Sequence, residues 1–130
     1  MDVEVFTLCD AAADYQGRLS ILGIFDTIFA ASLPATHPQC SVALRIRFSK
    51  VEEGKHSLTL HIVDYDGKMI IPPLNGEFGI QLTGNDQHGT VNLVLNLQGL
   101  TFNRLGEYAV NLAIDSHELD TLPFLVKQPK

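Results

Sequence analysis

The sequence predicts an all-β protein, built as an antiparallel two-sheet β-sandwich with eight or nine strands. Two observations lead to this prediction. Apolar and polar residues alternate along most of the chain, and short turn signals interrupt the alternation at intervals of roughly 8–12 residues. The 3.6-residue periodicity of an amphipathic helix is missing from every long stretch, so alternating strands and helices are not expected.

Three strand regions are predicted in the first part of the chain. Residues 1–10, MDVEVFTLCD, alternate almost from the start. Residues 21–33, ILGIFDTIFAASL, are apolar at both parities, which fits either a central strand covered on both faces or an apolar surface that meets a partner. Residues 33–38, LPATHP, are bounded by prolines and are expected to cross between the sheets. Residues 40–49, CSVALRIRFS, predict a half-buried strand.

The remaining strands follow the same logic. Residues 56–65, 90–98 and 107–115 each have a period of two, with polar side chains on one face. The Asp66-Gly67 pair predicts a tight turn. In residues 68–76, KMIIPPLNG, the two prolines predict a short edge strand followed by a bend. No repeat or linker divides the chain, so residues 1–130 are expected to form a single β-sandwich domain.

Composition and charge narrow the possible functions. Nine basic and fifteen acidic residues give a formal charge of −6, and Lys and Arg are not clustered. Surfaces that track phosphates need concentrated positive charge, so binding to nucleic acid or to an anionic membrane is not expected. The N-terminus has no basic segment followed by an apolar one, and no apolar run approaches the roughly 20 residues of a membrane helix. We therefore expect a cytoplasmic protein.

The segment FNRLGEYAVNLAID, residues 102–115, raises the question of whether Tyr108 belongs to a site or to the fold. Gly106 allows a sharp turn just before a strand. A tyrosine near the start of a late strand can bond back to the backbone, as in the tyrosine corner of immunoglobulin-like sandwiches. The pattern predicts structural roles for Gly106 and Tyr108 in an immunoglobulin-like fold.

A family resemblance supports this fold prediction. The segments VEVFTLCDAA, GRLSILGIFDTIFA, LRIRFS and GEYAVNLAID, followed by TLPFLV, span nearly the whole chain. Together they resemble a family of short bacterial proteins that is described only as a domain of unknown function. The resemblance implies an immunoglobulin-like β-sandwich in a bacterial cytosol. It carries no active site, and its motifs are apolar and turn patterns.

A few acidic residues are candidates for binding a cation. Asp64 and Asp66 lie at one predicted strand end, and Asp115 follows another. Calcium takes six to eight oxygen ligands, so two acidic loops that meet at one end of a sandwich could form a calcium or small-ligand site. The simpler interpretation is that Asp66 makes a turn and that the other carboxylates are solvated. No resident cofactor is expected.

The sequence contains no motif typical of a catalytic site, and we expect no enzymatic activity. Cys9 and Cys40 lie within strand patterns, where they are expected to be buried free thiols, although a disulfide between them stays open. The five histidines lack metal-ligand spacing. A nucleophile elbow and a phosphate-binding glycine loop are missing as well.

Association with a protein partner or with a second copy is the function that these exclusions favour. The apolar segment 21–33 could supply the contact surface, and sandwiches leave edge strands that can pair with other chains. The sequence therefore predicts a non-enzymatic binding or assembly module, with a homodimer as its working form. The alternative is a small-ligand or calcium-binding sandwich that uses Asp64, Asp66 and Asp115.

Overall fold

The architecture is all-β, as predicted. A computed structural model describes every residue from 1 to 130. It contains nine strands and a single 3₁₀ turn, η1, and no helix in it could cross a membrane. The strands are β1 (Asp2–Tyr15), β2 (Arg18–Phe25), β3 (Thr27–Phe29), β4 (Ala35–Ser49), β5 (Gly54–Asp64), β6 (Leu74–Ile80), β7 (His88–Phe102), β8 (Gly106–Ile114) and β9 (His117–Lys127), and η1 covers Lys50–Glu52.

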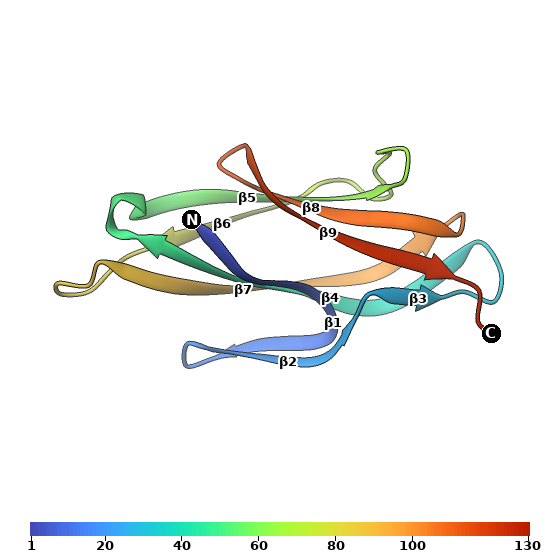
Figure 1. Ribbon diagram of the computed structural model, residues 1–130, viewed down its shortest axis with the longest axis horizontal. Coiled ribbons are helices and arrows are strands. Elements are labelled where there is room, and N and C mark those ends of the chain that lie inside the picture. Colours follow the sequence, from blue (N-terminus) through green and yellow to red (C-terminus); the bar gives the residue numbers. More distant parts are fainter.

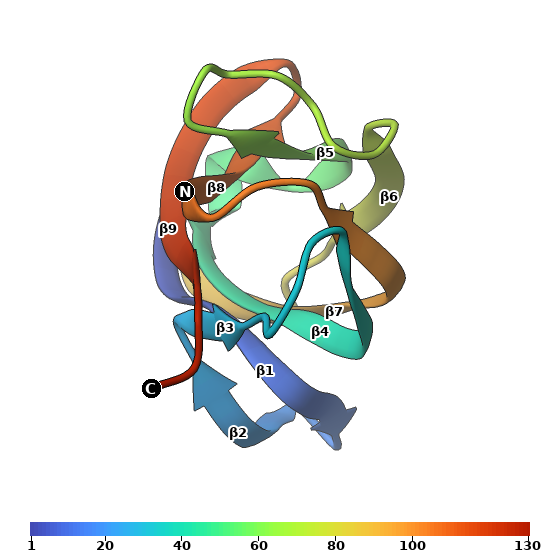
Figure 2. The same cartoon turned by 90° about the vertical axis from the view of Figure 1, so that its right-hand side faces the viewer.

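The strands form two sheets that face each other across the core (Figure 1). The first sheet has the order β2-β1-β4-β7, and the second has the order β3-β9-β8-β5-β6. Seen from one end in Figure 2, the first sheet curls beneath the second. The long strands β4 and β7 pair along almost their entire length, from Ala35 opposite Phe102 to Ser49 opposite His88.

Alternation builds the core between the sheets. On β4, Val42, Leu44 and Ile46 point into it and are fully buried. Aliphatic residues of β5 and β8 face them from the second sheet, and an aromatic cluster that combines Phe102 of β7 with Tyr108 and Phe124 of the second sheet belongs to the same core. Burying each such side chain stabilises the fold by about 1.5–3 kcal/mol relative to leaving it in water.

The expectation of purely antiparallel sheets is wrong at one edge. β3 pairs with β9 in parallel, with Thr27 opposite Leu125. After β2 the chain leaves the first sheet at Asp26, whose carbonyl accepts a hydrogen bond from the backbone N–H of Leu125 at 2.9 Å. This bond anchors the crossing chain beside the last strand of the second sheet, and β3 then runs in the same direction as that strand.

Two proline predictions need correction. In residues 68–76 the bend comes first, and the edge strand β6 starts at Leu74, after Pro72 and Pro73. Before the prolines the segment makes only an isolated bridge, between Met69 and Val63. Because Pro72 and Pro73 have no N–H to donate, the continuous ladder with β5 begins beyond them, at Leu74. The crossover between the sheets ends earlier than residues 33–38 suggested, because β4 already begins at Ala35.

The hairpin formed by the second half of β1 and by β2 leaves the plane of its sheet. Residues 2–9 of β1 pair with β4, but residues 11–22 fold back beneath β4 and β7, on the side away from the second sheet (Figures 1 and 2). Gly23 adopts φ of +70°, and a Cβ at this position would clash with the carboxylate of Asp10. The fold-back therefore requires glycine at this position.

Candidate functional site

The fold-back gives the hairpin two different faces. The inner face holds Ala12, Leu19 and Ile21, which are half-buried against the first sheet. Asn92 of β7 fixes this face, because its Nδ2 donates to Asp14 Oδ1 and to the Gly17 carbonyl, both at 3.1 Å. The first sheet is thus covered on both sides where the hairpin crosses it.

The opposite side of the hairpin is exposed and largely apolar. We call it the hairpin face, and it consists of Ala11, Ala13, Tyr15, Ser20, Leu22 and Ile24. The exposed fraction is 70% for Leu22, 65% for Ile24 and 66% for Tyr15. Exposed apolar patches of this kind are found at protein–protein and membrane contact sites and in ligand-binding grooves.

The hairpin face ends at a free sheet edge. β2 is the outermost strand of its sheet, with β1 on one side and no strand on the other. An edge strand presents backbone N–H and C=O groups that another chain can pair with. Apolar side chains and unpaired backbone groups therefore occur together along β2.

A groove of about 350 Å³ continues this surface toward β3. Ile24 and Phe29 contribute apolar side chains to it, and Phe29 on β3 is 63% exposed. Asp10 and His37 also line the groove, and the buried Nε2 of His37 has no hydrogen-bond partner. The exposed apolar surface thus extends from the hairpin to the short edge strand of the second sheet.

These observations decide between the two interpretations of residues 21–33. A central strand covered on both faces is wrong, because β2 and β3 are both edge strands. On the covered face, Ile21 of β2 is half-buried and Ile28 of β3 is buried. On the other face, Leu22, Ile24 and Phe29 are exposed to solvent. Only one face of this apolar segment is therefore covered within the chain.

The acidic residues predicted as a cation site do not come together. Asp64 lies at the end of β5, whereas Asp115 accepts a hydrogen bond from the backbone N–H of Ser57 near its start. Seven residues of strand separate these positions, which is roughly 23 Å. The structure contains no group of three or more His, Cys, Asp or Glu residues placed to hold a metal. The prediction that the two acidic loops meet at one end is wrong.

Each of these carboxylates already has partners. Arg104 Nη2 lies 2.7 Å from Asp66 Oδ2 and 3.2 Å from Asp64 Oδ2. The backbone N–H groups of Lys68 and Asp66 donate to Asp64 Oδ1, and together with Arg104 they lower the pKa of Asp64. These carboxylates stabilise the turn after β5.

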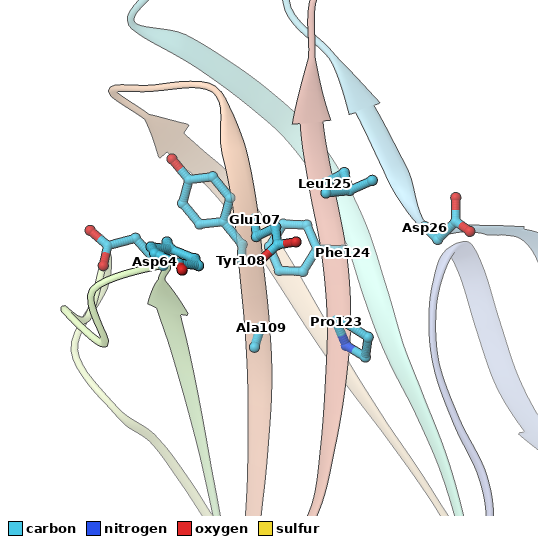
Figure 3. A pocket seen from close by; sticks show the side chains of 9 residues that line it. Asp26, Asp64, Glu107, Tyr108, Ala109, Pro123, Phe124 and Leu125 are labelled. Carbon is cyan, nitrogen blue, oxygen red and sulfur yellow. The ribbon is translucent and has the colours of Figure 1, made fainter.

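A second hollow lies on the outer face of the second sheet (Figure 3). It measures about 490 Å³, and its apolar floor consists of side chains from β8 and β9, among them Ala109 and Pro123. Asp64 and Asp26 flank it on opposite sides, and Glu107 lies between them. The hollow is open and acidic, and the only hydroxyls on its lining are the phenols of Tyr65 and Tyr108.

Tyr108 and Gly106 form a corner at the start of β8. The Tyr108 hydroxyl donates to the Arg104 carbonyl at 2.7 Å, and its ring packs edge-on against Phe102 and stacks with Phe124. Gly106 adopts φ of +126°, which side chains rarely tolerate. This hydroxyl is fully used by the turn that it closes.

The two cysteines are buried free thiols. Cys40 lies in the core between the sheets, where burial raises its pKa to about 11. Cys9 lies on the other side of the first sheet, where the hairpin covers it, and its Sγ donates to the Ser41 carbonyl at 3.6 Å. Burial, followed by the charge of Asp10, raises the pKa of Cys9. Neither thiol is placed as a nucleophile.

Sequence reasoning missed the fold-back and the role of Asn92. One local signal was present: Gly23 interrupts an apolar strand, and an isolated glycine in a strand indicates a bend or a close backbone approach. The contact from Asn92 spans 78 residues to Asp14, so no local pattern could show it. The hairpin face depends on this contact.

Comparison with known proteins gives a family without an assigned activity. A family model described as "Family of unknown function (DUF6941)" matches residues 4–127. No curated protein matches the chain.

Proposed function

This chain belongs to the family of unknown function DUF6941, and we propose that it is a non-enzymatic assembly module that associates through its hairpin face. The observation that carries the proposal is the exposure of Leu22 and Ile24 on an edge strand. Burying each of these two side chains in a complex would contribute up to about 1.5–3 kcal/mol to the free energy of association, before the entropic cost of association is subtracted.

The hairpin itself favours this role. A two-stranded hairpin is marginally stable in water, and here Asn92 and the inner face fix it in place. The protein therefore presents a rigid apolar ribbon, which loses little conformational entropy when a partner covers it. A mobile loop with the same side chains would lose more.

We also propose that the fold is immunoglobulin-like. The strand series from β4 to β9 corresponds in order and sheet membership to strands B, C, C′, E, F and G of such sandwiches. Tyr108 then stands near the start of strand F, where the tyrosine corner occurs. Two free thiols and the family resemblance support the further proposal of a bacterial cytoplasm.

The proposal is tested by measuring mass in solution. Light scattering over a range of concentrations should show a mass above that of the 14.3 kDa monomer for the wild type. The double variant Leu22→Ser/Ile24→Ser should be monomeric, because it removes the apolar contact without touching the core.

The matched control is Val51→Ser. Val51 is 93% exposed on η1, away from the hairpin, so its replacement removes the same kind of surface at a different place. The control should keep the wild-type mass. A monomeric wild type at every concentration, or a double variant with the wild-type mass, would contradict association through the hairpin face.

A further inference from the structure

We propose that the partner of the hairpin face is a second copy of this chain, paired β2 to β2 in antiparallel orientation about a two-fold axis at Leu22. This inference rests on the proposed function and deepens it by naming the partner and the register. Two-fold contacts use the same patch on both subunits, so the patch must be complementary to itself.

The charges of β2 meet this condition. Arg18 stands at the start of the strand and Asp26 directly follows its end, each four residues from Leu22. Both are exposed, and neither takes part in a salt bridge within the chain. In an antiparallel pair centred on Leu22, Arg18 of each copy comes beside Asp26 of the other, at the bend where that chain leaves its sheet.

The side chains between these charges fit the same register. On the outer side, Leu22 meets its own copy and Ile24 meets Ser20. On the inner side, Gly23 leaves room opposite Ile21. Moving the two-fold axis by one residue, to Ile21 or to Gly23, places Arg18 opposite Ile24 or Ile28, which leaves both charges unpaired.

Pairing of two copies would also add strands to the hairpin, which is only marginally stable as a two-stranded ribbon. The two hairpins would join into a four-stranded sheet with the order β1-β2-β2-β1, in which neither β2 strand keeps a free edge. Sheets of three or more strands gain independent stability that single hairpins lack. Opposite charges across neighbouring strands add a modest contribution and select the register.

Charge reversal tests the register. Arg18→Asp and Asp26→Arg should each weaken dimerisation roughly ten-fold, because each turns two attractive pairs into two repulsive ones. The double variant Arg18→Asp/Asp26→Arg restores opposite charges and should dimerise within about two-fold of the wild type. Affinity is measured by analytical ultracentrifugation at low salt.

Disulfide trapping gives a second and independent test. Leu22→Cys should form an intermolecular disulfide readily under mild oxidation, because directly opposed residues in an antiparallel pair have Cα atoms roughly 4.5–5.5 Å apart. Val51→Cys is equally accessible and should not cross-link. The native thiols are buried and do not interfere.

The outcomes separate the register from the proposed function. If Leu22→Ser/Ile24→Ser abolishes association while charge reversal has no effect, or the double reversal fails to rescue, the register is overturned and the hairpin face stands. If the wild type is monomeric at every concentration and Leu22→Cys does not cross-link, the proposed function and the second copy as its partner are both overturned. Rescue by the double reversal together with selective trapping at residue 22 supports both the second copy as the partner and the register centred on Leu22.

Discussion

At the scale of single residues, Tyr108 shows how the fold itself supplies the hydrogen-bond partner of a buried polar group. Its ring is only 4% exposed and lies within an aromatic cluster with Phe102 and Phe124. Its hydroxyl reaches the Arg104 carbonyl, four residues earlier in the chain. A buried phenol needs such a partner, and here the bond also closes the turn between β7 and β8.

The Tyr108→Phe substitution isolates this bond. We expect the free energy of unfolding to fall by about 0.5–1.5 kcal/mol, because the ring packing stays and only the hydrogen bond is lost. Urea denaturation monitored by circular dichroism measures the change. Tyr65→Phe is the matched control, since Tyr65 is 76% exposed and its hydroxyl has no partner, and its effect should stay within about 0.5 kcal/mol. Equal effects of the two substitutions would argue against the corner.

At the scale of elements, local pattern predicted the long strands well, whereas their edges required tertiary information. Strict alternation predicted β4 and β8, because a period of two over many residues has few other solutions. Segment 21–33 was ambiguous for a physical reason. Apolar residues at both parities show that both faces of the segment are apolar, but they do not show which face is covered. The cover comes from strands far away in sequence, since β2 contacts β4 and β3 pairs with β9.

Another element-level contact joins β5 to the turn between β8 and β9. His56 Nδ1 lies 2.6 Å from Asp115 Oδ2, and His56 Nε2 lies 2.6 Å from the Glu52 carbonyl. Both acceptors lack a proton to donate, so both ring nitrogens must donate, which only the imidazolium form can do. The hydrogen bond to Asp115, followed by that to the Glu52 carbonyl, raises the pKa of His56. The bond from His56 likewise lowers the pKa of Asp115.

This geometry predicts a pH dependence of stability. Because the folded-state pKa of His56 is raised above its ordinary value of 6.5, its contribution is full below that pH and is lost as pH rises through the raised pKa. The contribution of Asp115 is present above its ordinary value of 3.8 and is lost as pH falls through the lowered pKa. We therefore expect the free energy of unfolding to be larger at pH 6 than at pH 8.5.

Urea titrations of the wild type and of Asp115→Asn at both pH values measure this effect. The variant should lose part of the pH dependence, because its amide cannot stabilise the imidazolium. His88→Gln, at an exposed position on β7, serves as the control and should keep the wild-type dependence. Identical pH dependence in the wild type and in Asp115→Asn would show that the pair does not contribute.

At the scale of the whole molecule, the first sheet has a different cover on each side. The second sheet covers one side, and the fold-back of β1 and β2 covers part of the other, as Figure 2 shows. Cys9, Ser41 and Ala43 are buried on this second side although they lie outside the core between the sheets. The candidate site could not be predicted for the same reason, since the fold-back decides which hairpin side chains reach solvent.

Cys9 lies beneath the hairpin and Cys40 lies between the sheets, so the reactivity of each thiol reports on a different cover of the first sheet. The Asn92→Ala substitution tests whether the hairpin opens independently of the core. The substitution removes the bonds to Asp14 and Gly17 that hold the hairpin against β7. We expect the hairpin to open locally more often, with a free-energy difference of about 1–3 kcal/mol, so that alkylation of Cys9 accelerates roughly ten-fold or more. Cys40, between the sheets, should react at the wild-type rate, as measured by mass spectrometry of iodoacetamide-labelled peptides.

The matched control for this prediction is Asn75→Ala on β6. Asn75 accepts a hydrogen bond from Thr59 in the second sheet, so its loss removes a comparable bond without touching the hairpin. It should leave the labelling rate of Cys9 unchanged. If Asn92→Ala accelerated Cys9 and Cys40 equally, both thiols would become accessible through global unfolding, and the hairpin would not be an independently opening cover. Selective labelling of Cys9 would instead show that the hairpin opens on its own, while the two sheets of the sandwich stay folded.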